Sequence, residues 1–293
     1  MFPDFLPQEV HLLENSDSIF VAANIKRYRI STPLLASQIA TAYVKLGSNN
    51  PPILLLHGFD SSVLEFRHLI PALASQHQTW AVDLLGFGFT ERSPYLSYNP
   101  NAIEKHLYCF WQTLIERPVI LVGVSMGGAT AIDFTLTHPE AVAKLILINS
   151  VGYNGSFPIG KLLPEPTIEM GVEFWRQRRI QSLFWGKNLG LFDRKTEDAI
   201  RCAALPSLMP NWDLAIKDFT RSGGYYFLKE RIPLLDKPTL ILWGERDDEL
   251  GTEVAYQFKG AIANSKLVWL SGLGHSPQWE QPQLVAKEIL EFI

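Results

Sequence analysis

The chain has 293 residues, of which 47% are hydrophobic and 19% are charged. This length and composition predict a globular protein with a large buried core, built as one domain or as one domain with an insertion. The formal net charge of −4 disfavours the basic surface that DNA or RNA binding requires, so we expect no nucleic-acid partner.

Membrane, export and metal signals are not found in the sequence. The longest apolar runs, such as residues 53–56 and 145–148, fall far short of the ~20 residues that a membrane-spanning helix needs. The first ten residues, MFPDFLPQEV, contain an early acid and two prolines and are not typical of a secretory signal. Cys109 and Cys202 are too few for a disulfide framework, and no Cys/His cluster indicates a metal. We therefore expect a cytoplasmic protein with no integral membrane segment, no metal and no cofactor.

The N-terminal part, residues 1–47, is expected to be an antiparallel lead-in to the main fold. Its predicted strands are 18–23, 26–30 and 39–46, which are rich in β-branched and aromatic residues. A turn made of Gly, Ser, Asn and Pro then ends this part of the chain.

Strands and helices alternate over the next hundred residues. Short, unbroken apolar runs predict buried strands at 53–56, 79–84, 119–122 and 144–149. Helices are predicted at 62–75, at 99–116 and directly after residue 125. Because a helical crossover joins parallel strands, the fold class is α/β, with a mostly parallel central sheet and helices on both faces.

The alternation stops after residue 150 and resumes near residue 239. Residues 151–232 contain no buried apolar strand, but helix-like segments separated by prolines, which predicts an inserted helical cap. The α/β core is then formed by residues 1–150 and 233–293. Its last elements are predicted strands at 239–243 and 266–270 and helices at 253–261 and 283–292.

The predicted cap is rich in aromatic residues. Most of them are expected to fill its own small core, and a few to face a pocket. The set comprises Phe174, Trp175, Phe184, Trp185, Phe192, Trp212, Tyr225, Tyr226 and Phe227. Three arginines, Arg176, Arg178 and Arg179, are expected to form a solvated helix face.

Ser125 stands at the centre of a G-x-S-x-G pentapeptide, residues 123–127, directly after a predicted strand. Glycines at the first and last positions remove the Cβ atoms that would clash where the chain reverses from strand to helix. The turn would leave the serine hydroxyl exposed at a helix N-terminus, where negative charge is favoured.

Asp247 and His275 also follow predicted strands. Reactive groups in open parallel sheets gather at the carboxyl ends of the strands, so we expect both residues near Ser125. A serine hydroxyl needs a base to take its proton and a carboxylate to orient that base. The chain order Ser, acid, His is the order of the α/β-hydrolase arrangement.

Five segments of the chain resemble motifs of the α/β-hydrolase superfamily, in the family's order. They are LLLHGF at 54–59, DLLGFGFT at 83–90, GVSMGG at 123–128, LWGERDD at 242–248 and GLGHSPQWEQP at 272–282. The resemblance, which covers nearly the whole chain, is to serine hydrolases with a helical cap. It implies Ser125 as the nucleophile, His275 as the general base and Asp247 as the orienting acid. It also implies an oxyanion hole made by the backbone N–H groups of Phe59 and Met126.

Several neighbouring residues compete for these roles. Asp247 is preferred to Asp248 because the family places its acid three residues after the glycine. His57 is expected to brace the oxyanion loop rather than to transfer protons. Asp60 is expected to point away from the oxyanion hole or to cap the following helix, since a carboxylate in the hole would oppose the charge being stabilised.

The resemblance implies an enzyme that cleaves a carboxylic ester or related acyl bond through an acyl-enzyme, and the aromatic cap suggests that the substrate is an apolar small molecule. Serine at the nucleophile position disfavours the dehalogenases and epoxide hydrolases of this fold, which use aspartate. Two alternatives stay open: a carbon–carbon bond hydrolase of the dienoate-cleaving type, and a non-catalytic ligand-binding protein on the same fold. The substrate and the oligomeric state are not determined by the sequence.

Overall fold

The central sheet dominates the computed structural model, which describes residues 1–189 and 194–293. Within these residues eight strands form one sheet in the order β1-β2-β4-β3-β5-β6-β7-β8. They are β1 (Lys26–Thr32), β2 (Leu35–Leu46), β3 (Ile53–Leu56), β4 (Thr79–Val82), β5 (Val119–Val124), β6 (Val142–Ile148), β7 (Thr239–Gly244) and β8 (Ser265–Leu270). From β4 to β8 all neighbours pair in parallel, whereas β1 and β2 add an antiparallel edge. The predicted mostly parallel sheet is confirmed.

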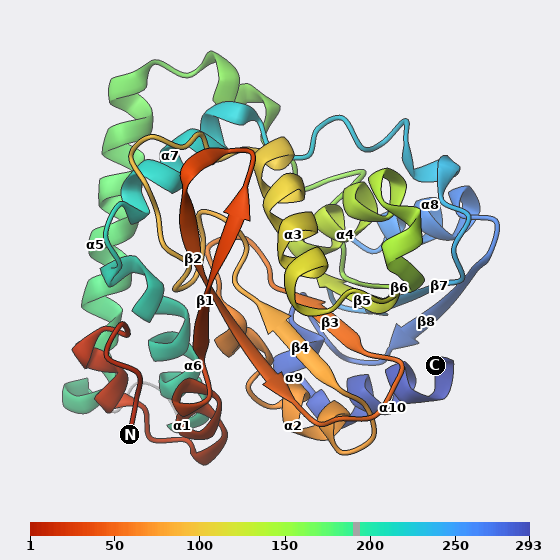
Figure 1. Cartoon of the computed structure of the whole chain (residues 1–293), viewed down its shortest axis with the longest axis horizontal. Helices are drawn as coiled ribbons and strands as arrows, with labels where there is room; N and C mark the ends of the chain where they lie inside the picture. The colour runs from red at the N-terminus through yellow and green to blue at the C-terminus, as the bar shows by residue number, and fades with distance from the viewer. Residues whose placement is uncertain (190–193) are drawn as a thin grey trace.

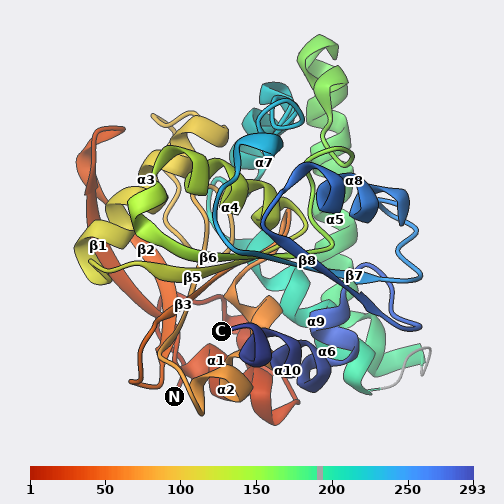
Figure 2. The same ribbon diagram turned by 90° about the vertical axis from the view of Figure 1, so that its right-hand side faces the viewer.

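Helices cover both faces of the sheet, as Figure 2 shows with the sheet seen nearly edge-on. Two hydrophobic clusters lie on opposite faces of the sheet, and alternate residues of β3 belong to each. Leu54 and Leu56 face one side, and Ile53 and Leu55 face the other. The first side is covered by α3 (Pro100–Leu114), α4 (Met126–Thr137) and α8 (Glu253–Ala261), and the second by α2 (Leu69–Ala74) and α10 (Pro282–Phe292). Both sides of the strands are therefore buried, which explains their unbroken apolar sequences.

The predicted strand at residues 18–23 is wrong, because this segment is the helix α1 (Ser16–Ala23). The side chain of Asn15 accepts hydrogen bonds from the backbone N–H groups of Asp17 and Ser18 and so caps the helix. The predicted helix at 62–75 is divided into a short 3-10 turn, η2 (Val63–Phe66), and α2.

A helical insertion follows β6, as predicted, and Figure 1 shows its long helices together at one side of the sheet. They are α5 (Glu165–Leu189), α6 (Arg194–Ala204) and α7 (Trp212–Ser222), with short 3-10 turns between and around them. No strand occurs among the described residues of 151–232, the segment that we call the cap. Across the described ranges, no helix is both long enough and apolar enough to cross a membrane.

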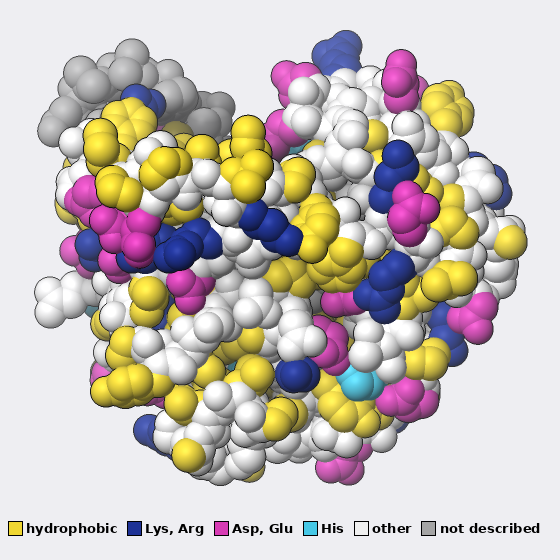
Figure 3. Space-filling view, turned by 90° about the horizontal axis from the view of Figure 1, so that it is seen from above, with side chains coloured by type: hydrophobic (Ala, Val, Ile, Leu, Met, Phe, Trp, Pro, Cys, Tyr) yellow, Lys and Arg dark blue, Asp and Glu magenta, His cyan; other side chains and the backbone are white. Residues whose placement is uncertain are grey.

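The aromatic residues of the cap are more exposed than predicted. Four of them lie 43–65% exposed, namely Phe174, Trp175, Phe184 and Tyr226, whereas Trp212 and Tyr225 are buried. The side chain of Trp185, and Phe192, lie outside the described residues. A long helix packed along one side of a domain keeps one face in solvent, and the space-filling view shows hydrophobic side chains among charged ones on the surface (Figure 3). The buried side chains of the described part of the cap join the two hydrophobic clusters of the core, for example Trp212 in one and Leu205 in the other.

Candidate active site

Ser125 occupies the sharp turn between β5 and α4. Its backbone has φ +50° and ψ −119°, a conformation that residues other than glycine rarely adopt. The turn is fixed by close approaches: a Cβ on Gly127 would lie 2.1 Å from the carbonyl oxygen of Leu56, and one on Gly123 would lie 2.3 Å from that of Gly127. Glycine is required at both positions because backbone atoms occupy the space, and the turn is therefore held by packing rather than by a flexible loop.

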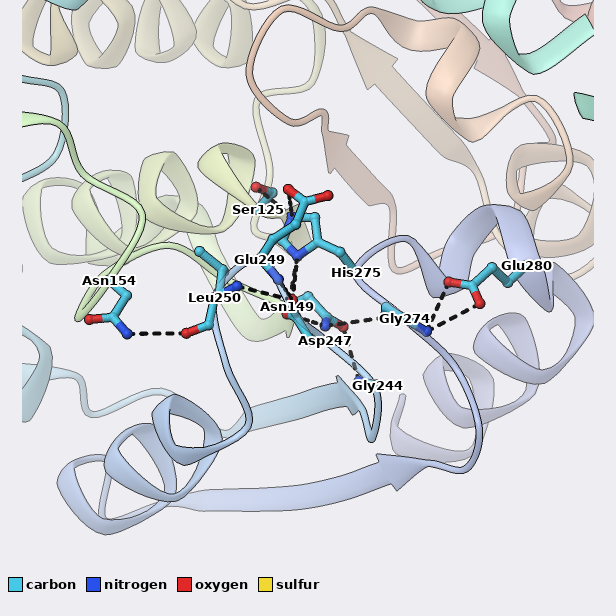
Figure 4. Close-up of polar contacts among 10 residues, drawn as sticks. All are labelled: Ser125, Asn149, Asn154, Gly244, Asp247, Glu249, Leu250, Gly274, His275 and Glu280. Atoms are coloured by element: carbon cyan, nitrogen blue, oxygen red, sulfur yellow. Dashed lines mark hydrogen bonds and ion pairs between the residues drawn. The ribbon is translucent and has the colours of Figure 1, made fainter. Parts of the chain in front are cut away.

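Three side chains from three strand ends form one hydrogen-bonded row (Figure 4). The Oγ of Ser125 lies 3.1 Å from Nε2 of His275, and Nδ1 of His275 lies 3.0 Å from Oδ2 of Asp247. Since an ionised carboxylate only accepts hydrogen bonds, Nδ1 carries the proton and Nε2 is left to accept one from the serine hydroxyl. The arrangement can move a proton from serine to imidazole.

Asp247 is held by more groups than the imidazole alone. Asn149 donates from Nδ2 to Oδ2 at 2.6 Å, and the backbone N–H groups of Glu249 and Leu250 donate to Oδ1 at 3.0 and 3.1 Å. The side chain of Asp247 is fully buried, while Asp248 is exposed on the same loop. The carboxylate that faces His275 is thus fixed in position from several directions.

Asn149 is a site residue to which the sequence motifs assigned no role. It lies directly after β6, and an amide is not among the residue types of the Ser, acid, His pattern. The available signal was topological, since β6 and β7 are neighbours and their ends bring Asn149 beside Asp247. Asn149 also accepts from the backbone N–H of Gly244, so it joins the two strand ends.

The electrostatics of the pair favour a charged imidazole next to a charged acid. Burial acts to raise the pKa of Asp247, but hydrogen bonds from His275 and Asn149 outweigh it, and the pKa lies below its usual value. Burial acts to lower the pKa of His275, but the hydrogen bond and the charge of Asp247 outweigh it, and that pKa lies above its usual value. An imidazolium formed at His275 would therefore be stabilised.

The oxyanion hole is predicted to consist of the backbone N–H groups of Met126 and Phe59. Met126 is the first residue of α4, where helical N–H groups have no carbonyl partner one turn earlier. Phe59 lies in the loop after β3, and both residues line one cavity with Ser125. Phe59, Met126 and Ser125 thus border a common space, and the role of the two N–H groups stays a prediction.

The loop after β3 is braced by His57, as predicted. Nδ1 of His57 donates to the carbonyl of Gly58 at 2.8 Å, and Nε2 accepts from the backbone N–H of Leu84 at 3.1 Å. Complete burial lowers the pKa of His57 to about 4, so the ring is neutral at pH 7. The N–H of Gly58 donates to the buried carboxyl of Glu65 at 2.9 Å, which fixes the same loop from the core side.

The cavity over Ser125 has a volume of about 440 Å³, within the usual range for small-molecule sites. Apolar and aromatic side chains from the core and the cap dominate its lining, among them Phe59, Val151, Phe219 and Tyr225. Among the described residues that line it, Glu249 is the sole acidic side chain and there is no Lys or Arg. A carboxylate oxygen of Glu249 lies 3.7 Å from Nε2 of His275.

Known proteins resemble this chain over most of its length. The model of the alpha/beta hydrolase family matches residues 53–288. The chain is 33% identical to the Arabidopsis thaliana alpha/beta hydrolase domain-containing protein VTE7, covering 99% of this chain and 90% of that protein. It is 27% identical to a 2-hydroxy-6-oxo-6-(2'-aminophenyl)hexa-2,4-dienoic acid hydrolase of Metapseudomonas resinovorans, covering 88% and 89%. The solved structure of a thermophilic esterase from Thermogutta terrifontis matches with a TM-score of 0.74 at 23% identity, over 91% of this chain and 97% of that one. The chain therefore belongs to the α/β-hydrolase family.

Proposed function

We propose that this protein is a serine hydrolase that cleaves a carboxylic ester, or a related acyl bond, of an apolar small molecule. The observation that carries the proposal is the hydrogen-bonded row of Ser125, His275 and Asp247 at the floor of an apolar cavity. A row of this kind is the means by which a neutral hydroxyl becomes a nucleophile near pH 7.

Acylation begins when Oγ of Ser125 attacks the ester carbonyl carbon while Nε2 of His275 takes the hydroxyl proton. The carbonyl oxygen gains the negative charge and accepts hydrogen bonds from the N–H groups of Phe59 and Met126. The tetrahedral intermediate then breaks the bond to the alkoxy group, which leaves as an alcohol with the proton from His275. The acyl group stays on Ser125 as an ester.

Deacylation repeats these steps with water as the nucleophile. His275 takes a proton from water as its oxygen attacks the acyl carbon, and then returns that proton to Oγ of Ser125 as the bond to serine breaks. A carboxylic acid leaves and the enzyme is restored. Asp247 stays ionised throughout and stabilises the imidazolium by its charge.

The charge of the cavity favours neutral acyl groups. The Metapseudomonas relative is named for a dienoic acid, which is an anion near pH 7. An anion at this site would meet Glu249 with no Lys or Arg among the described lining residues to offset the repulsion. The ester is therefore preferred to carbon–carbon cleavage of a dienoate.

A fluorophosphonate probe tests the nucleophile directly. We expect one label per chain, on the peptide that contains Ser125, and no label on Ser125→Ala. Equal labelling of Ser125→Ala would refute the assignment. Absence of labelling and of turnover, with ligand binding unaffected by Ser125→Ala, would support the non-catalytic alternative.

A matched series of p-nitrophenyl esters tests the acyl preference. Neutral straight-chain esters should be cleaved with higher kcat/KM than a p-nitrophenyl monoester of a dicarboxylic acid of the same length, because Glu249 repels the free carboxylate. Faster cleavage of the anionic ester, or turnover of a 2-hydroxy-6-oxo-dienoate above that of every ester, would contradict the preference.

A further inference from the structure

Asp60, the residue after Phe59, is a buried core carboxylate whose hydrogen-bond donors come from the cap. It is 3% exposed and has a φ of +50°. The indole N–H of Trp175 donates to Oδ2 at 2.7 Å, the indole N–H of Trp212 donates to Oδ1 at 2.8 Å, and Nε of Arg179 donates to Oδ2 at 3.1 Å. Trp175 and Arg179 lie on α5, and Trp212 begins α7.

These contacts rule out one of the two alternatives expected for Asp60 and correct the expectation for Arg179. Asp60 does not cap the turn that follows, because the side chain of Ser62 accepts the capping hydrogen bond there. Arg179 does not lie on a solvated face: its side chain is 21% exposed, and it pairs with Asp60 while lying 4.8 Å from the ring centre of Trp175. Both residues appeared isolated in the sequence because 119 positions separate them.

Burial of Asp60 is tolerable only with these donors. Burial raises the pKa of the Asp60 carboxyl, and the charge of Arg179 and the two indole donors oppose that rise. An ionised carboxylate removed from water without such partners is strongly destabilised. If α5 and α7 moved away, the carboxylate would turn toward water and carry its backbone with it.

The loop that contains Asp60 has two different anchors. At its first end, Gly58 donates to Glu65, which in turn accepts from Nε2 of Gln278 at 3.0 Å, and all three belong to the core. After Phe59 the loop contacts the cap: Asp60 binds three cap donors, and the ring of Phe59 lies 5.7 Å from that of Phe219 on α7 and 5.7 Å from that of Phe87 in the core. The loop rejoins the core at Val63, whose backbone N–H donates to Asp83 at 2.6 Å. Phe59 thus lies between Gly58, which the core holds, and Asp60, whose side chain the cap holds.

We infer that Asp60 is a positioning residue that makes the Phe59 half of the oxyanion hole depend on the seating of cap helices α5 and α7. The inference rests on the proposed function, because it gives the N–H of Phe59 its role. The reaction geometry would then be complete only when the cap is closed over the substrate. A cap displaced for substrate entry would leave Ser125 and His275 in place but the hole incomplete.

The test separates loop positioning from general stability. Asp60→Asn keeps the size of the side chain. One of its two oxygens, however, becomes an NH₂ group, which cannot accept the hydrogen bond that a cap donor made to that oxygen. We expect kcat to fall by about 10²–10³, the cost of losing one oxyanion donor, with KM little changed. Affinity for a trifluoromethyl ketone, which forms an oxyanion on Ser125, should fall by the same factor.

The matched control breaks a different contact between the cap and the N-terminal segment, in which the Arg201 side chain is 3% exposed. Nη1 of Arg201 on α6 lies 3.3 Å from a carboxylate oxygen of Glu14 in the N-terminal segment. Arg201→Gln should lower Tm without changing kcat or the ketone affinity. Trp175→Phe removes a single donor and keeps an aromatic side chain, although a smaller one, so it serves if Asp60→Asn does not fold; a fall of ~10-fold in kcat and ketone affinity is expected.

Two outcomes would overturn the inference while leaving the proposed function intact. One is a folded Asp60→Asn or Trp175→Phe enzyme with unchanged kcat and ketone affinity. The other is an equal loss of ketone affinity in Arg201→Gln. Failure of the proposed function is distinguishable, because the unmodified enzyme would then neither turn over esters nor react with the fluorophosphonate.

Discussion

The carboxyl edge of the sheet and the cap meet at the same cavity but are held by different interactions. At the sheet edge, backbone atoms lie so close that a Cβ on Gly127 would have no room. On α5, a Cβ on Gly171 would meet nothing within 4 Å. The cap is joined to the core largely by side chains, such as Trp175 and Arg179 on Asp60. The turn at Ser125 is thus tightly packed, whereas α5 has free space around Gly171.

The largest effect is expected for Asp247→Asn, which tests the packed region. The amide cannot hold His275 in the tautomer that accepts the serine proton, so kcat should fall by roughly 10⁴ with the fold intact. Asp248→Asn, on the exposed part of the same loop, is the control and should keep full activity. A comparable loss of kcat in Asp248→Asn would mean that Asp247 is not the orienting acid.

Gly127→Ala tests whether backbone packing holds the turn at Ser125. The new Cβ would require the carbonyls of Leu56 and His57 to move, since they would lie 2.1 and 2.5 Å away. We expect a loss of about 1–3 kcal/mol in the free energy of unfolding, measured by urea denaturation, together with lower activity. An unchanged free energy of unfolding would mean that the turn can accommodate a Cβ atom at residue 127 after all.

Gly171→Ala is the matched substitution in the cap, and we expect it to raise the free energy of unfolding rather than to lower it. The position is helical and the added methyl group meets open space. Alanine lowers the entropy of the unfolded chain, so the free energy of unfolding should rise by roughly 0.5–1 kcal/mol. A lower free energy of unfolding for Gly171→Ala would mean that α5 is as tightly packed at this position as the turn at Ser125.

The smallest effect is expected for Glu249→Gln, at the boundary of the two regions. His275 must be neutral to accept a proton, so activity is lost as the pH falls through its raised pKa. The charge of Glu249 contributes to that rise, so its removal should lower the pKa and move the acid limb of kcat/KM to lower pH. Glu253→Gln, an exposed acid on α8, is the control; a shift in the opposite direction for Glu249→Gln would contradict the assignment.

Most of the core architecture could be predicted from the sequence, because local sequence patterns mark its strands and turns. Unbroken apolar runs such as residues 53–56 predicted strands that are buried on both faces, and two glycines predicted the tight turn at Ser125. Parallel topology then predicted that the residues after β5, β7 and β8 would share one edge. The structure brings Ser125, His275 and Asp247 within hydrogen-bond distance there, and their catalytic roles stay predictions, as does the division of the chain at residues 151 and 232.

The tertiary structure decided what local signals do not contain. The helix at residues 16–23 buries Val21 against the core, which the order of residues in the segment does not reveal, although its N-cap, Asn15, is a local signal that the strand prediction overlooked. Asn149 gained its role from a neighbouring strand, and Arg179 from a carboxylate 119 positions away. Periodicity and turn chemistry depend on nearest neighbours in the chain, whereas the partner of a buried polar group is fixed only when distant segments pack together.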